Sequence, residues 1–147
     1  MQQYLLAQLG LLLKLLVAGI CGAAIGYERK NNLKEAGIRT HMLVAIGSAL
    51  IMLVSKYGFN DVLNIDGYDL DPSRIAAQIV TGISFLGAGM IFIRKQSING
   101  LTTAAGIWAT AGIGMAIGTN MYFAGIAATI LVFVIQDLMN REFKWLK

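Results

Sequence analysis

Charge is what the second half of this sequence lacks. From Gln96 to Gln136, 41 consecutive residues carry no charged side chain. A helix needs about 20 mostly apolar residues to cross the hydrocarbon core of a bilayer, so this stretch is long enough for two crossings. Gly118, Thr119 and Asn120 mark the predicted turn between them. Because a segment this apolar cannot lie partly in water, we expect the bilayer to be the solvent around the chain.

Cysteine, histidine and proline are also scarce, with one residue of each. A single cysteine excludes an internal disulfide, and one cysteine with one histidine cannot build a zinc site or a Cys/His nucleophile pair. The chain has no Walker-type phosphate loop, and no soluble basic domain carries its net charge of +4. We therefore expect no enzyme, no cofactor and no nucleic-acid partner.

The sequence consists instead mostly of long apolar stretches. Hydrophobic residues make up 56% of the chain and charged residues 14%, and the mean hydropathy of +0.65 lies outside the range of soluble domains. The alternation of apolar and polar residues that is typical of β-barrel strands is missing. Charge clusters delimit five predicted transmembrane helices, at about 4–27, 38–58, 73–93, 100–118 and 120–138. The prediction is an all-α integral membrane protein, with a transmembrane domain over 1–140 and a cytoplasmic interfacial tail over 141–147.

The basic residues are divided unequally between the two sides of this arrangement. Lys56 and Arg74 lie on one side, whereas nine follow the first, third and fifth predicted helices. The nine are Arg29, Lys30, Lys34, Arg39, Arg94, Lys95, Arg141, Lys144 and Lys147. Lysine and arginine favour the cytoplasmic side, so we predict an N-terminus outside and a C-terminus inside. The first apolar run lacks the basic start and cleavage site of a signal peptide, and we expect it to be a retained span.

Glycines recur at helical spacing within the predicted spans. The GxxxG spacings at 22–26 and 114–118 predict helix faces on which two backbones approach closely. We assign packing roles to Gly22, Gly26, Gly87, Gly89, Gly106, Gly114 and Gly118. Such faces also pair between chains, and a small bundle buries few faces internally, so we predict a homodimer or small homo-oligomer.

Lys14 interrupts the first predicted span. Some ten residues into that span it is expected near the middle of the bilayer, where a lysine costs roughly 2.5–3.5 kcal/mol on insertion scales unless it is paired. It should therefore face the bundle. Two interpretations stay open: a structural pairing with backbone carbonyls, Ser84, Gln78 or another polar group, and a role in a solute or partner site.

Other polar candidates lie at the predicted helix ends. Asp71 is the expected N-cap of the third helix, with Pro72 at its first position. Asn99 is the expected cap of the fourth helix, and we expect the threonine hydroxyls that follow to bond back to helix carbonyls. His41 is expected at the depth of the lipid headgroups. The functional candidates at these ends are Glu28, Arg29, Arg39, His41, Asp71, Arg74, Asn99, Thr102 and Thr103.

The loop before the third helix is acidic. Asp66, Asp69 and Asp71 are close enough in sequence to reach one divalent cation, although their spacing is not that of an EF-hand loop. A solvated turn is the alternative interpretation. The sequence leaves a weak metal-site candidate here and no stronger one elsewhere.

Five strings follow one another along nearly the whole chain: GYER at 26–29, AGIRTHMLVA at 36–45, DPSRIAAQ at 71–78, GISFLGAG at 82–89 and GLTTAA at 100–105. In this order they resemble the motifs of the MgtC/SapB family of bacterial inner-membrane proteins. The resemblance implies a multi-pass, five-helix protein linked to growth under magnesium limitation and to intracellular virulence. It also implies, for some members, modulation of other membrane proteins, such as ATP synthase and phosphate uptake. The virulence-associated members carry a soluble C-terminal domain, which we do not expect here.

Two hypotheses from different classes follow. The first is a non-catalytic regulator that works through helix contacts with itself and with another membrane protein, motivated by the small-residue faces and the lack of catalytic chemistry. The second is a transporter or channel for Mg²⁺ or another small solute, motivated by Lys14 and the acidic loop. No predicted span carries a carboxylate at its centre, which weighs against the second hypothesis.

Overall fold

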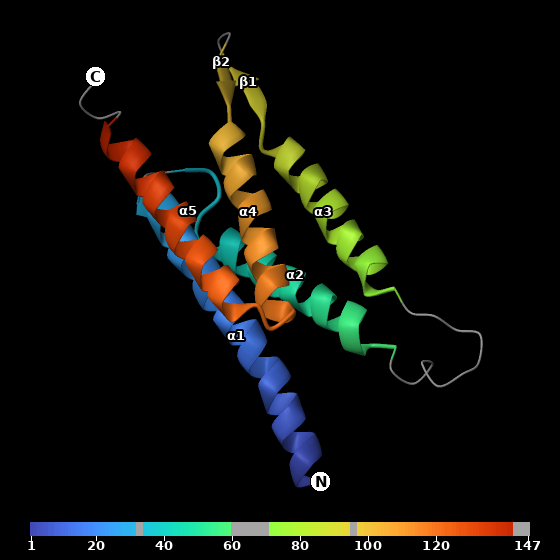
Figure 1. The fold of residues 1–147 in the computed structure, drawn as a ribbon. Helices are drawn as coiled ribbons and strands as arrows, with labels where there is room; N and C mark the ends of the chain where they lie inside the picture. Colours follow the sequence, from blue (N-terminus) through green and yellow to red (C-terminus); the bar gives the residue numbers. More distant parts are fainter. Residues whose placement is uncertain (32–33, 60–70, 95–96, 143–147) are drawn as a thin grey trace.

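The part of the chain that the structure describes forms five helices and one short β-hairpin (Figure 1). The computed structural model describes residues 1–31, 34–59, 71–94 and 97–142. The start of α1 and the end of α5 lie at opposite ends of the molecule (Figure 1). The prediction of five helices is confirmed. The elements in order are α1 (Gln2–Asn31), α2 (Ile38–Tyr57), α3 (Pro72–Gly89), β1 (Phe92–Arg94), β2 (Ser97–Asn99), α4 (Leu101–Gly118) and α5 (Tyr122–Glu142).

The helices differ in their suitability for crossing a membrane. Among the described residues, α1, α2 and α4 are long and apolar enough to cross one, and α5 contributes a shorter apolar helix over Tyr122–Leu138. The 18 residues of α3 are less apolar and fall outside this group. Length and composition therefore support three membrane spans among the described residues.

The core is formed where α1, α2 and α4 meet. These three helices pack on one another, α5 covers α1 and α4, and α3 packs on α4 and α2. Ala18, Ala45, Ala49 and Ile117 form a fully buried apolar layer at the centre. The small alanine side chains explain why these helix axes can come close together.

Local sequence signals set several of the helix ends. The Asp71 carboxylate caps α3, because it accepts hydrogen bonds from the backbone N–H of Ser73 at 2.9 Å and from the Ser73 hydroxyl at 2.6 Å. These bonds, led by that of the hydroxyl, hold the pKa of Asp71 below its usual value. Pro72 occupies the first helical position, as predicted. The predicted turn after α4 is also present, and Asn120 there has a φ of +70°.

Several of the predicted helix bounds differ from the structure. The first helix runs from Gln2 to Asn31, beyond both of its predicted ends, and its residues up to Gly10 are exposed. The third helix ends at Gly89, although an uncharged sequence led us to extend it to Ile93. Absence of charge marks an apolar environment and does not distinguish a helix from the short strand that follows here.

A β-hairpin joins α3 to α4. The strands pair in antiparallel register, with Phe92 opposite Asn99 and Ile93 opposite Ile98. Gly100, with a φ of +87°, turns the chain into α4, and a Cβ at this position would collide with the Met90 carbonyl oxygen. Asn99 is therefore not the cap of α4, since Gly100 occupies that position and the Asn99 amide donates to the Ser97 carbonyl at 3.1 Å.

The glycines of the two GxxxG spacings lie against α2 within the same subunit. A Cβ on Gly22 would collide with the His41 carbonyl oxygen, and one on Gly26 would lie 2.5 Å from the Ile38 Cα. On α4, Gly114 lies against the Ala45 carbonyl, and Gly118 has the Ala49 carbonyl oxygen 3.0 Å from its Cβ position. Gly89, in contrast, has nothing within 4 Å of this position.

Candidate functional site: a buried polar cluster

Polar side chains gather at the end of the bundle where α1 ends and α2 and α4 begin. We define the polar cluster as Glu28, Arg29, Glu35, His41, Thr103, Thr110 and Gln136. All but Glu35 are buried, and His41 and Thr110 have no exposed surface at all. Burying polar groups costs free energy unless they bond to one another, so their hydrogen bonds decide whether this end of the bundle is stable.

The first part of the polar cluster joins α1 to α4. The Arg29 guanidinium donates from Nη2 to the Thr103 hydroxyl at 2.8 Å, and that hydroxyl donates to the Glu35 carboxylate at 3.1 Å. Thr103 thus bonds away from its own helix, contrary to our expectation, because a buried guanidinium lies within reach. A bond from the backbone N–H of Glu35, together with the Thr103 hydroxyl, holds the pKa of Glu35 below its usual value. The folded chain therefore favours the carboxylate form.

The second part joins α2 to α4. His41 Nδ1 lies 2.8 Å from the Thr110 hydroxyl oxygen, and the single proton of that hydroxyl is donated to the Gly106 carbonyl at 2.8 Å. His41 Nδ1 must therefore be the donor, which leaves Nε2 of a neutral imidazole as an acceptor. That Nε2 is buried and has no hydrogen-bond partner within the described part of the chain.

Gly106 makes room for this arrangement. A Cβ on Gly106 would lie 2.9 Å from Gln136 Nε2 and 3.6 Å from His41 Cε1. His41 is completely buried within the bundle, and its position at headgroup depth stays a prediction.

Lys14 lies far from the polar cluster. It precedes Asn31, the last residue of α1, by 17 residues, which is about 25 Å of helix. Its side chain is 8% exposed, and Nζ lies 5.1 Å from the ring centroid of Tyr57 at the end of α2. Neither Ser84 nor Gln78, the named candidates, supplies this contact. Because Tyr57 is the last residue of α2, this contact places Lys14 at the end of α2 opposite to the polar cluster.

The remaining sequence candidates are dispersed. Arg39, Arg74 and Thr102 are exposed, and Asp71 serves as a cap. Asp66 and Asp69 lie outside the described residues. Within the described part of the chain, no group of three His, Cys, Asp or Glu side chains could hold a metal ion.

Sequence reasoning missed three members of the polar cluster: Glu35, Thr110 and Gln136. Gln136 carried a signal, since a carboxamide at the end of a long apolar stretch is expensive in lipid and should face a polar partner. Thr110 and Glu35 carry no comparable local signal. Each becomes recognisable only when its partner from a distant segment is known.

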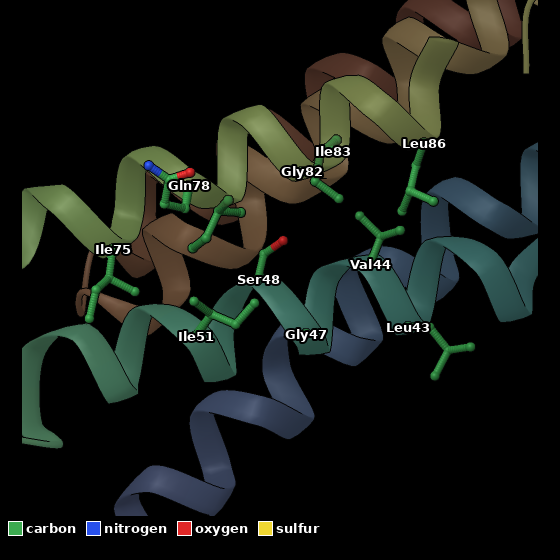
Figure 2. Close-up of a pocket in the computed structure, with 11 residues that line it drawn as sticks. Leu43, Val44, Gly47, Ser48, Ile51, Ile75, Gln78, Gly82, Ile83 and Leu86 are labelled. Atoms are coloured by element: carbon green, nitrogen blue, oxygen red, sulfur yellow. The ribbon is translucent and has the colours of Figure 1, made fainter. Parts of the chain in front are cut away.

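A groove of about 450 Å³ lies between α2 and α3, away from the polar cluster. Figure 2 shows its lining, with Gly47 on α2 and Gly82 on α3. Neither glycine has an atom within 4 Å of its Cβ position, so the groove is open there. Apart from Ser48 and Gln78 its lining is aliphatic or glycine, which fits contact with lipid or an apolar helix.

Comparison with known proteins identifies the family. The sequence pattern of the MgtC family matches residues 15–144. The chain is 53% identical over 130 residues to the putative magnesium transporter YhiD of Escherichia coli K12, and 42% identical over 129 residues to the protein MgtC of Salmonella typhimurium LT2. Each alignment covers 88% of this chain, but only 60% and 52% of those proteins. No solved structure matches. The chain is a membrane protein of the MgtC family.

Proposed function

We propose that this chain is a non-catalytic protein of the bacterial inner membrane that supports adaptation to magnesium limitation by modulating other membrane transport or energy-coupling proteins. In this proposal all five helices cross the membrane, and the polar cluster lies at the cytoplasmic end. The names of the relatives, MgtC and a putative magnesium transporter, support the link to magnesium. The regulatory role is what the resemblance implies for some members of the family, and the proposal extends it to this chain.

The apolar layer at the centre of the bundle is the observation that carries the proposal. Ala18, Ala45, Ala49 and Ile117 lie between Lys14 on one side and the polar cluster on the other, and all four are fully buried. These four side chains offer no polar group that could replace the water around an ion. The arrangement favours a bundle that holds its shape and acts through its surface.

The second candidate function is transport of Mg²⁺ or another small solute. The name of the Escherichia coli relative and the buried Lys14 favour it. Transport would require a path between subunits or a rearrangement that opens the apolar layer.

Replacing Lys14 and Arg39 separates the two functions. Under the regulator proposal, the Lys14→Met variant should retain function, because the contact of Lys14 with the Tyr57 ring lies at the edge of the bundle. The Arg39→Ala variant should lose function, because Arg39 is an exposed cation at the polar end, where a partner can reach it. Arg74→Ala is the matched control, because Arg74 is equally exposed at the other end. Removing an exposed side chain should change stability by no more than about 0.5 kcal/mol. Growth in low magnesium and membrane insertion are the measurements.

The opposite pattern of results would contradict the regulator proposal. Loss of growth in Lys14→Met with retention in Arg39→Ala would assign function to the interior. Mg²⁺ flux into proteoliposomes that exceeds empty vesicles and disappears in Lys14→Met would lead to the same conclusion.

The orientation gives a separate prediction. In a Cys21→Ser background, a cysteine at Met121 should react from outside with a membrane-impermeant thiol reagent, and one at Lys34 only after permeabilisation. Both positions are exposed and lie at opposite ends of the bundle, and the excess of basic residues places the Lys34 end inside. Labelling of the Lys34 position alone in intact cells would show that the topology is the reverse of the predicted one.

A further inference from the structure

Two lysines from different helices meet at one tyrosine where α2 ends. The Nζ atom of Lys14, on α1, lies 5.1 Å from the ring centroid of Tyr57, and that of Lys56, on α2, lies 5.3 Å from it. Both ammonium groups also interact with the Tyr57 hydroxyl at the tip of the ring. One phenol therefore brings two positive charges together. We call these three side chains the dilysine site.

The charge of the dilysine site is not balanced by an acidic side chain in the described part of the chain. Neither lysine forms an ion pair there. Among the described carboxylates, Asp71 is the nearest in sequence to Tyr57, and it interacts with Ser73 and Arg74 instead. Lys14 is only 8% exposed, so water compensates its charge poorly. A buried charge without a counter-charge costs free energy, which a bound anion would reduce.

The dilysine site is also reachable from a membrane surface. Tyr57 is the last residue of α2, which is long and apolar enough to cross a membrane, so the site lies at one surface whichever way α2 is oriented. Lys56 and Tyr57 are half-buried, and a ligand can therefore approach them from that surface.

The donors of the dilysine site suit an oxyanion. Each ammonium group carries three hydrogen-bond donors and no acceptor, and the phenol hydroxyl adds one more donor. Lysine binds phosphate as a compact point charge, and basic pockets between transmembrane helices bind lipid head groups. We propose that the dilysine site binds a phosphate group, either in a lipid headgroup or as free inorganic phosphate. This inference is independent of the regulatory role.

Binding to the purified full chain in detergent tests the proposal and identifies the source of the phosphate. In the lipid arm, native mass spectrometry compares the retention of phosphatidylglycerol with that of a diacylglycerol that has the same acyl chains but no phosphate. In the free-anion arm, equilibrium dialysis measures the binding of radioactive inorganic phosphate at constant ionic strength. Saturable binding in the first arm alone would identify a lipid headgroup, and saturable binding in the second would identify free phosphate.

Variants that remove one charge locate the binding. Lys14→Met should weaken it about tenfold, because a hydrogen bond between charged groups is lost. Lys56→Gln changes a half-buried side chain and should weaken binding several-fold without unfolding the chain, whereas Lys56→Arg keeps the charge and should bind like the parent. Lys34→Gln is the matched control, because it removes the same charge at an exposed position at the other end of the bundle and should also bind like the parent.

Three results would overturn the proposal. They are saturable binding by the parent in neither arm, parent-like binding by Lys56→Gln, and a loss in Lys34→Gln as large as that in Lys56→Gln, which would indicate attraction by net charge alone. The Lys56→Gln result decides the question even if Lys14→Met does not fold. Growth in low magnesium is not the readout, so a negative result here leaves the regulator proposal unchanged.

Discussion

Replacing Gly114 with leucine should unfold the bundle, whereas Gly112→Leu, two residues earlier on the same helix, should leave it folded. The Cβ position of Gly114 collides with the Ala45 carbonyl oxygen and lies 3.0 Å from Ser48 Cβ, while that of Gly112 has nothing within 4 Å. Backbone atoms cannot rotate away as a side-chain tip can, so α2 and α4 would have to separate. We expect Gly114→Leu to lose at least about 3 kcal/mol of unfolding free energy.

Unfolding of the two variants by sodium dodecyl sulfate in mixed micelles measures this difference. Gly112→Leu should equal or slightly exceed the parent, because leucine is the better helix former by roughly 0.8 kcal/mol. A Gly114→Leu protein as stable as the parent would contradict the close contact between α2 and α4.

This packing also bears on the predicted oligomer. The GxxxG face of α4 is occupied by α2 within one subunit, so dissociation of a Gly114 or Gly118 variant would report damage to the fold as well as to an interface. A homodimer or small homo-oligomer stays a prediction. Gly47 and Gly82, which line the open groove and have room for a side chain, are the better positions at which to test it.

Thr103→Val should destabilise the polar end of the bundle, and Thr102→Val should not. The Thr103 hydroxyl is the link between the buried Arg29 guanidinium and the Glu35 carboxylate, while Thr102 is exposed. Valine keeps the shape but leaves Arg29, which is 2% exposed, without this acceptor. Loss of a hydrogen bond to a buried charged group costs about 1.5–3 kcal/mol.

Thr103→Ser tests the cause of that loss. Serine restores the hydroxyl without the methyl group, so the free energy of unfolding should return most of the way to that of the parent. If Thr103→Ser were as unstable as Thr103→Val, the methyl contact and not the hydrogen bond would be responsible.

Much of the helical framework could be predicted because its signals are local. The uncharged stretch from 96 to 136 contains α4 and most of α5, Asp71 and Pro72 begin α3, and Asn120 lies in the turn before α5. Each signal acts within a few residues of itself, through a cap, a turn or the solvent that a segment requires. The end of α3 was predicted wrongly for the same reason, since no local signal within that apolar run distinguishes the strand from the helix.

The candidate site could be predicted only in part, because its bonds join distant segments. Glu28, Arg29, His41 and Thr103 were recognised as polar residues at helix ends, but not as members of one buried cluster. The bond from Arg29 to Thr103 spans 74 residues and that from His41 to Thr110 spans 69, and no local pattern encodes either pairing. Lys14 shows the same limit, since its contact with Tyr57 depends on how α1 packs on α2 and not on where its apolar run begins.

The sequence by itself determined that this chain is a helical membrane protein of one family, because hydropathy, capping residues and motifs are properties of short segments. Only the tertiary structure decided which glycines contact α2, which polar side chains are buried together, and which two lysines meet at the Tyr57 ring. Those outcomes depend on the relative placement of whole helices. That placement is set by the sum of many weak packing contacts, in which no single residue carries a readable signal.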